Sequence, residues 1–68
     1  MAPTPRQIGA KLKRFRMKKG LSQYALAQEA GVSREYIRRL EAGASDPTVG
    51  MLQRLAKVLG APLTELLE

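Results

Sequence analysis

The stretch LSQYALAQEAGVSREYIRRLEAG, from Leu21 to Gly43, contains two short helical patterns separated by the tripeptide Gly31-Val32-Ser33. A serine precedes each pattern (Ser22 and Ser33), and a serine oxygen can accept the free N–H groups of an opening helical turn. The intervening glycine adopts a positive φ at little cost, so one helix can end there and the next can begin. The stretch therefore predicts two consecutive helices joined by a tight turn, at about residues 22–30 and 33–42.

The apolar residues of this stretch fall on one side of each predicted helix, and we expect them to point inward. They are Leu21, Leu26, Ala27, Ala30, Val32, Ile37 and Leu40. The outward side of the second helix then carries Arg34, Glu35, Arg38 and Arg39. A polar, arginine-rich helix presented by a helix-turn-helix has the shape and chemistry that a DNA major groove accepts.

The stretch and its flanks resemble the phage-repressor and Cro-type (Xre-like) helix-turn-helix family of DNA-binding proteins. The matching positions are Gly20-Leu21-Ser22-Gln23, Leu26-Ala27, Ala30-Gly31-Val32-Ser33, Ile37, Leu40-Glu41-Ala42-Gly43, Pro47-Thr48, Leu52, Leu55-Ala56-Lys57 and Leu59-Gly60. With Ile8-Gly9 and Leu12, the resemblance covers roughly residues 6 to 68. It implies an all-α fold, a compact five-helix bundle of the lambda-repressor type, and a sequence-specific regulator of transcription that binds double-stranded DNA.

The rest of the chain supplies three further helical patterns. Thr4-Pro5-Arg6-Gln7 is typical of a helix start, and Ile8, Leu12 and Phe15 form an apolar stripe on a helix expected from about Pro5 to Lys19. Thr48 is the expected cap of a fourth helix that ends at Gly60, and Pro62 begins a short fifth one. The expected buried residues of these last two helices are Val49, Leu52, Leu55, Ala56, Leu59, Leu63, Leu66 and Leu67.

Length and composition bound the possible functions. A chain of 68 residues and 7.5 kDa is one domain, here residues 1–68, near the lower size limit for a self-sufficient core. It contains no cysteine and no histidine, which excludes disulfides and removes the commonest general base and metal ligand. We therefore expect no enzymatic activity, no cofactor or metal, and no small-molecule ligand. With no signal-peptide or membrane-spanning pattern, a cytoplasmic location is expected.

Positive charge is concentrated in the first twenty residues. The net charge is +6, yet residues 1–20 contain seven basic residues and no acid, residues 21–44 are balanced, and residues 45–68 carry −1. A basic protein of this kind suits a polyanionic partner, although a solvated surface helix would have the same composition.

The resemblance assigns the base-reading positions to Arg34, Glu35 and Arg39. Arginine can donate two hydrogen bonds to guanine O6 and N7, and a glutamate can accept from cytosine N4. Glu35 is unfavourable beside a phosphate, so we expect it to read a base or to orient Arg39 at i+4.

Other residues are candidates for backbone or mixed contacts with DNA. Gln23 lies in the first turn of its helix, where free N–H groups attract phosphate. The remaining candidates are Tyr24, Tyr36, Arg38, Ser45, Lys11, Lys13 and Lys19. Asp46, next to Ser45, opposes phosphate binding by that loop. Arg16 and Glu41 match an arginine and a glutamate that pair in family members, and we expect them to form a structural ion pair.

One small module contacts few bases, so a homodimer on a palindromic operator is expected. The nearly neutral C-terminal third offers Met51, Val58 and Leu66 as contact residues, although core packing is an equal explanation for Leu66. The alternative is a protein-interaction module, antitoxin-like or coactivator-like, on the same fold. Such a module would need exposed apolar anchors on its second motif helix, where this sequence has three arginines and a glutamate.

Overall fold

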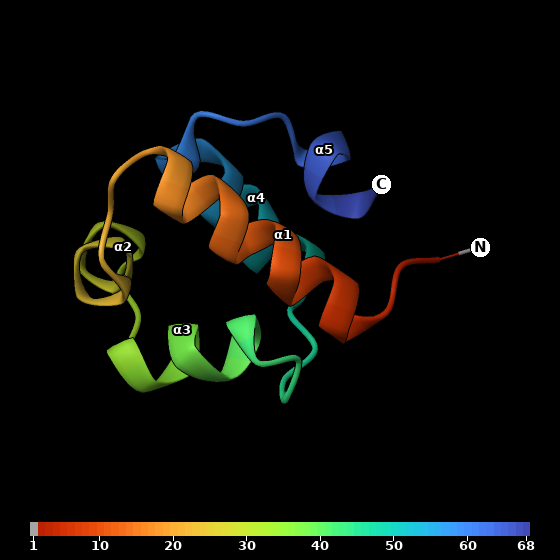
Figure 1. Cartoon of the computed structure of the whole chain (residues 1–68), viewed down its shortest axis with the longest axis horizontal. Helices are drawn as coiled ribbons and strands as arrows, with labels where there is room; N and C mark the ends of the chain where they lie inside the picture. Colours follow the sequence, from red (N-terminus) through yellow and green to blue (C-terminus); the bar gives the residue numbers. More distant parts are fainter. Residues whose placement is uncertain (1) are drawn as a thin grey trace.

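The computed structural model describes residues 2–68, which form five helices and no strand. They are α1 (Pro5–Lys18), α2 (Gln23–Ala30), α3 (Arg34–Glu41), α4 (Val49–Leu59) and α5 (Leu63–Leu67). In Figure 1, α1 crosses the middle of the molecule, with α3 on one side and α5 on the other. Contacts join α1 to α3 and α5, α2 to α3 and α4, and α4 to α5. The expected all-α, five-helix bundle with a helix-turn-helix is confirmed, and the helix bounds agree within about one residue.

Side-chain caps begin the first four helices, as the sequence predicts. The Ser22 and Ser33 hydroxyls accept the N–H groups of Ala25 and Tyr36, each at 3.0 Å. Thr48 caps α4 in the same way, and Thr4 and Gln7 form a reciprocal capping box at the start of α1. These bonds satisfy N–H groups that have no acceptor within their own helix.

Gly31 makes the turn between α2 and α3. Its φ is 73° and its ψ is 33°, a left-handed conformation that side chains with a Cβ rarely adopt. The N–H groups of Gly31 and Val32 return to the carbonyls of Gln28 and Ala27, which ends α2. Ser33 then starts α3 at once, so the two helices are held at a fixed relative orientation.

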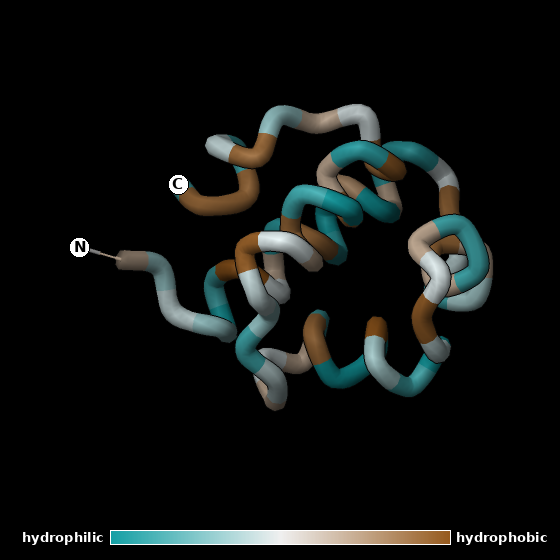
Figure 2. The backbone as a smooth tube through the Cα atoms, turned by 180° about the vertical axis from the view of Figure 1, so that it is seen from behind, coloured by the Kyte–Doolittle hydropathy of each residue, from teal (hydrophilic) through white to brown (hydrophobic). Residues whose placement is uncertain are grey.

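The core is formed by apolar residues from all five helices (Figure 2). Its fully buried members include Leu12, Leu26, Ile37, Leu40, Leu55 and Leu66. Phe15, Leu21 and Val32, which were expected to point inward, are partly buried against this cluster.

One expected core residue is wrong. By helical spacing, Val49 lies on the same side of α4 as the buried apolar residues, but it is 61% exposed. It is the first residue of the helix, and that end of α4 extends past the buried cluster. A helical stripe predicts which side of a helix is apolar, but not how far along the helix a partner covers it.

Gly9 lies where α1 meets the end of α3. A Cβ added at this position would lie 2.1 Å from the Leu40 carbonyl oxygen and 3.0 Å from that of Glu41. Such contacts are too short for any side chain, so the backbones can approach this closely only at a glycine. This contact sets the distance between α1 and α3 and therefore the position of the helix that carries the arginines.

Candidate nucleic-acid interface

The two sides of α3 differ sharply in exposure. Ile37 and Leu40 are each 1% exposed and join the core. The opposite side carries the exposed charged residues Arg34, Glu35, Arg38 and Arg39. Tyr36 is partly buried against the core, so only part of its ring is available to a ligand. The helix therefore presents one continuous charged side to solvent.

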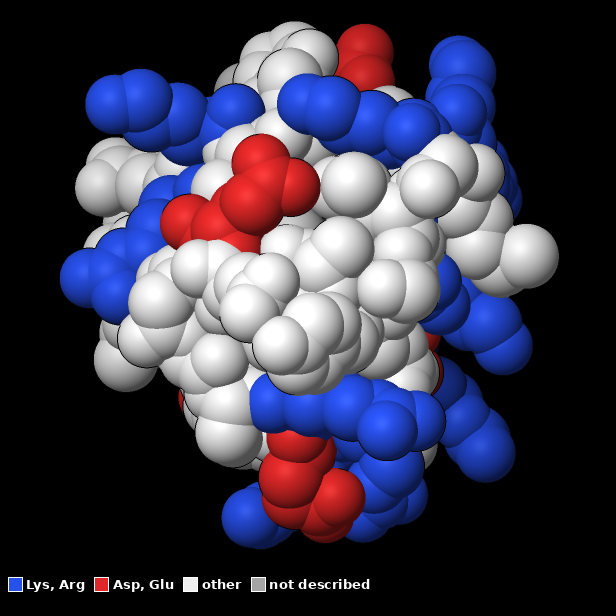
Figure 3. All heavy atoms as spheres, turned by 90° about the vertical axis from the view of Figure 1, so that its left-hand side faces the viewer, with Lys and Arg blue, Asp and Glu red and all other residues white. Residues whose placement is uncertain are grey.

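Figure 3 shows the side of the molecule on which α2 lies. Uncharged side chains occupy its centre, bordered by lysine and arginine side chains and, at the upper left, by acidic ones. Along the lower edge, at the height where α3 lies in Figure 1, acidic side chains are intermingled with basic ones. The charge on this side is therefore distributed as pairs and single cations and does not form one uniform positive patch.

Glu35 forms a two-pronged ion pair with Arg38. Its Oε1 accepts from Arg38 Nε at 2.9 Å, and its Oε2 accepts from Arg38 Nη2. The hydrogen bonds from Arg38, together with the charges of Arg38 and Arg39, hold the pKa of the Glu35 carboxyl below its ordinary value. The expected orienting contact to Arg39 at i+4 is wrong: the bonded partner is Arg38 at i+3, which lies on the same side of the helix.

A second, buried pair joins α1 to the end of α3. Arg16 Nε donates to Glu41 Oε2 at 2.6 Å, and Arg16 Nη2 donates to Glu41 Oε1 at 3.0 Å. The remaining nitrogen, Arg16 Nη1, donates to the Leu21 carbonyl at 2.7 Å. The two side chains are only 11% and 4% exposed. The arginine therefore connects α1, the loop before α2 and the last turn of α3.

Gln23 joins this buried network from the first turn of α2. Its Nε2 donates to Glu41 Oε1 at 3.1 Å, which ties the start of α2 to the end of α3. The neighbouring Tyr24 is 57% exposed, and its hydroxyl accepts from Gln28 Nε2 at 2.7 Å. The amide of Gln23 is thus held by the fold, while Tyr24 lies on the open surface of α2.

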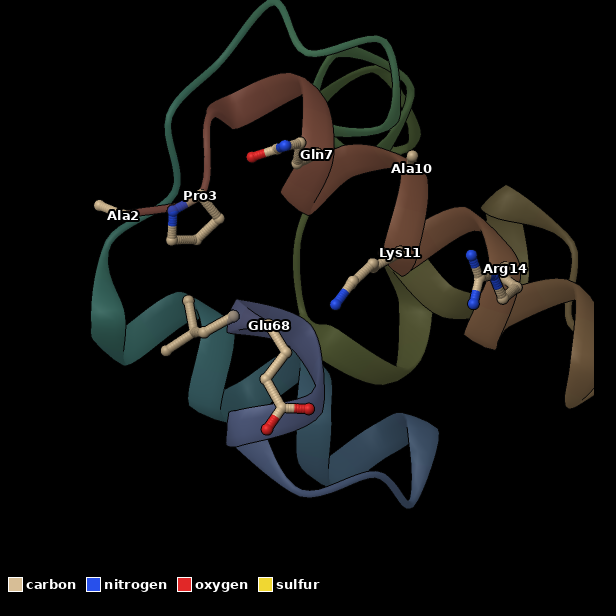
Figure 4. Close-up of a pocket in the computed structure, with 8 residues that line it drawn as sticks. Ala2, Pro3, Gln7, Ala10, Lys11, Arg14 and Glu68 are labelled. Atoms are coloured by element: carbon tan, nitrogen blue, oxygen red, sulfur yellow. The ribbon is translucent and has the colours of Figure 1, made fainter.

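The basic residues of α1 point to different sides of the molecule. Lys13 follows Gly9 by four residues, which puts it on the side of α1 that meets α3. Lys11 extends instead into a groove of about 380 Å³ between α1 and α5, with Glu68 on the opposite side (Figure 4). The groove is lined by Ala2, Pro3, Gln7, Ala10, Lys11, Arg14, Leu67 and Glu68.

Lys19 is engaged with the fold. Its ammonium donates to the Val58 carbonyl in the last turn of α4, where a cation also suits the negative end of the helix dipole. Lys11 and Lys19 thus lie against α5 and α4, and their contact with phosphate stays a prediction. Of the three lysines, Lys13 is the one that helical spacing puts on the side of α1 that meets α3.

The loop after α3 contains Ser45, which is partly exposed and precedes the exposed Asp46. The loop begins at Gly43, whose φ is 74°. No hydrogen bond from the Ser45 side chain to another residue is formed within residues 2–68. Its hydroxyl is therefore open to an external partner, although the adjacent carboxylate disfavours an anionic one.

The expected dimer residues differ in exposure. Met51 and Val58 are seven residues apart, on one side of α4, and both are partly buried against the core. Leu66 is 0% exposed, so its assignment as a dimer contact is wrong. It fills the space where the short α5 packs on α4 and α1, and a residue enclosed in one copy cannot contact a second.

Two contacts that position the helix-turn-helix were not predicted from the sequence. Arg54 Nη1 on α4 donates to the carbonyl of Ala30, the last residue of α2, at 3.2 Å. The other is the approach of Gly9 to α3 described above. Arg54 is an ordinary exposed helix residue by spacing, and only the packing of α4 on α2 reveals its role. Within residues 2–68, no group of acidic side chains has the arrangement of a metal site, and no helix is long and apolar enough to cross a membrane.

Comparison with known proteins agrees with this geometry. A family model described as Helix-turn-helix (HTH_3) matches residues 12–66. An uncharacterised HTH-type transcriptional regulator of Sinorhizobium fredii is 39% identical over 59 residues, which is 87% of this chain and 77% of the relative. The HTH-type transcriptional regulator SlrR of Bacillus subtilis is 37% identical over 62 residues, and the match covers 90% of this chain but only 41% of SlrR.

A solved structure extends the comparison. The biofilm regulator SinR, crystallised in complex with DNA, superimposes with a TM-score of 0.83 at 32% identity. The superposition covers 87% of this chain and 95% of that one. The family match over residues 12–66 includes the Gly31 turn and the whole of α3. The chain belongs to the Xre/Cro-like helix-turn-helix family (HTH_3), whose named relatives here are transcriptional regulators.

Proposed function

We propose that this chain is a sequence-specific, double-stranded DNA-binding regulator of transcription that inserts α3 into the major groove. The observation that carries the proposal is the outward side of α3, where arginines stand on a helix whose other side is locked into the core. Support comes from the SinR structure, a relative solved with DNA bound. A helix fixed in this way presents its side chains to base edges without a large loss of entropy on binding.

In this proposal, Arg34 and Arg39 read guanine, each through a pair of hydrogen bonds to O6 and N7. Both are exposed, and neither has an ion-pair partner among the described residues. Glu35 lies between them in sequence and is suited to accept from cytosine N4. Phosphate contacts come from the start of α2 at Gln23 and Tyr24, from Lys13, and from the loop at Ser45. These contacts set the register of the helix in the groove.

The protein-interaction alternative is less well supported. A protein-binding α3 needs apolar side chains that can enter a partner's pocket. The apolar side chains Ile37 and Leu40 are buried, and the exposed side of the helix carries four charged residues. We therefore assign α3 to DNA.

Selection from a pool of random double-stranded DNA tests this function directly. We expect one enriched motif containing guanines. Arg34→Ala and Arg39→Ala should each weaken binding to that motif by about 1–3 kcal/mol and change binding to random duplex much less. Arg14→Ala, which removes the same charge from the groove between α1 and α5, is the matched control. Equal losses on selected and random duplex would show that these arginines contact phosphate only.

We further propose that two copies bind a palindromic operator through their C-terminal thirds. Residues 45–68 carry a net charge of only −1, so these ends meet without the repulsion expected between two basic α1 helices. Met51 and Val58 form a partly exposed apolar strip on α4. Two recognition helices related by a twofold axis would enter successive major grooves about 34 Å apart.

Two valine substitutions on α4 test the dimer. Val58→Glu should abolish cooperative binding in a gel-shift titration and leave a species with one half-site filled. Val49→Glu makes the same change nine residues earlier, on the opposite side of the helix, and should have no such effect. Thermal melting of both variants checks that each is folded. A wild-type protein that fills single half-sites without cooperativity would disprove this part of the proposal.

A further inference from the structure

The ion pair between Glu35 and Arg38 lies on the side of α3 assigned to DNA. Both carboxylate oxygens are used, one by Arg38 Nε at 2.9 Å and one by Arg38 Nη2. The pair is open to solvent, with side-chain exposures of 57% for Arg38 and 62% for Glu35. Arg38 therefore projects from the recognition helix as half of a neutral pair, whereas Arg34 and Arg39 project as single cations.

This arrangement matters because affinity for DNA of any sequence comes from phosphate neutralisation. Each lysine or arginine that neutralises a phosphate releases a counterion and steepens the dependence of affinity on salt. An arginine already held by a carboxylate releases no such counterion, and its carboxylate repels the phosphate beside it. An exposed pair is also weakly held, so another donor brought against the carboxylate can replace the arginine.

We propose that Glu35 is a specificity-determining positioning residue that withholds Arg38 from phosphate on DNA of arbitrary sequence. At a site with cytosine beside Glu35, the base amino group replaces Arg38 as the donor, and Arg38 becomes free to bind the DNA. At sites without that cytosine, Arg38 stays bonded to Glu35. The inference rests on the proposed DNA-binding function. In it, Glu35 lowers the affinity for DNA of arbitrary sequence and so raises the ratio of specific to nonspecific binding that Arg34 and Arg39 provide.

The test measures binding to a random duplex by fluorescence anisotropy over a series of salt concentrations. For Glu35→Gln we expect tighter binding than wild type and a salt slope steeper by about 0.9, the change for one added phosphate contact. Binding to the selected motif should tighten less, so the ratio of specific to nonspecific affinity falls. Glu65→Gln makes the same change in net charge on α5, and its slope should equal that of wild type.

The double variant Glu35→Gln/Arg38→Gln separates the pair from the charge of Glu35 alone. If Glu35 acts by holding Arg38, the added slope disappears in the double variant. An added slope that persists there, or a Glu35→Gln slope equal to that of Glu65→Gln, overturns the inference. In both cases wild-type binding to duplex DNA remains, so the proposed function stands. A folded wild-type protein that binds no duplex at any salt concentration overturns both.

Discussion

Each side of α3 contributes a glutamate to an arginine–glutamate ion pair, and one of the two pairs is buried while the other is exposed. On the inner side, Arg16 and Glu41 are bonded through two nitrogen–oxygen contacts at side-chain exposures of 11% and 4%. On the outer side, Arg38 and Glu35 are also bonded through two contacts, at exposures of 57% and 62%. The contacts within each pair are alike, but the inner pair is buried and is also bonded to the Leu21 carbonyl and to Gln23, whereas the outer pair is open to solvent.

Burial changes what each pair contributes to the protein. A buried carboxylate that loses its arginine has no water to replace it, so breaking a buried pair is strongly destabilising. An exposed pair exchanges with water at little cost. The inner pair therefore fixes where α3 lies relative to α1 and α2, while the outer pair is free to rearrange when a ligand approaches.

The largest expected effect is from Glu41→Gln. The substitution leaves the Arg16 guanidinium buried with a neutral partner and weakens the link to Gln23. We expect a loss of about 3 kcal/mol in the free energy of unfolding and a fall in Tm of roughly 10 °C or more. Thermal and urea unfolding measure both quantities.

Glu35→Gln is the matched control for that experiment, because it makes the same substitution on the outer side of the same helix. It should melt close to wild type. A Glu41→Gln protein that melts within about a degree of wild type would show that the buried pair has no structural role, and the contrast between the two sides would fail.

Gly9→Ala tests the inner side without changing any charge. Alanine is the better helix former, but its Cβ would meet the Leu40 carbonyl oxygen at 2.1 Å and force α1 and α3 apart. We expect a net destabilisation of about 1–3 kcal/mol, measured by urea unfolding. Gly50→Ala on α4 is the control, since only the Thr48 hydroxyl lies near its added Cβ, at 4.0 Å. It should leave stability unchanged or slightly higher. Equal stability of the two variants would contradict the close approach.

The smallest effect concerns pH and the outer pair. The pKa of Glu35 is lowered in the folded protein, chiefly by its hydrogen bonds to Arg38. Its contribution to stability is therefore present above the ordinary carboxyl pKa of 4.5 and is lost as the pH falls through the lowered value. The difference in Tm between wild type and Glu35→Gln should be small at neutral pH, because the pair is exposed, and should vanish in acid. A difference that grows in acid would contradict this sign.

Much of the fold was readable from local signals. Ser22, Ser33 and Thr48 predicted the helix starts, and Gly31 predicted the turn, because a cap or a positive φ depends on residues close together in the sequence. The apolar spacing predicted the inward residues of α3 and most of the core. The candidate site followed from the same helical spacing, which places Arg34, Glu35, Arg38 and Arg39 outward.

What the sequence could not decide depends on distances between elements far apart in the chain. Val49 and Leu66 carry equivalent apolar signals, yet one is 61% exposed and the other 0%, because only packing determines where the core ends. Helical spacing separates Lys11 from Lys13 around α1, but only the packing of α5 and α4 shows what Lys11 and Lys19 meet. Likewise, a glutamate with arginines at i+3 and i+4 has two possible partners, and the folded geometry selected Arg38. Sequence alone determined which residues cap, turn and face inward, since those choices are local. The tertiary structure decided which of the remaining side chains meet, since burial and close approach exist only once the helices have packed.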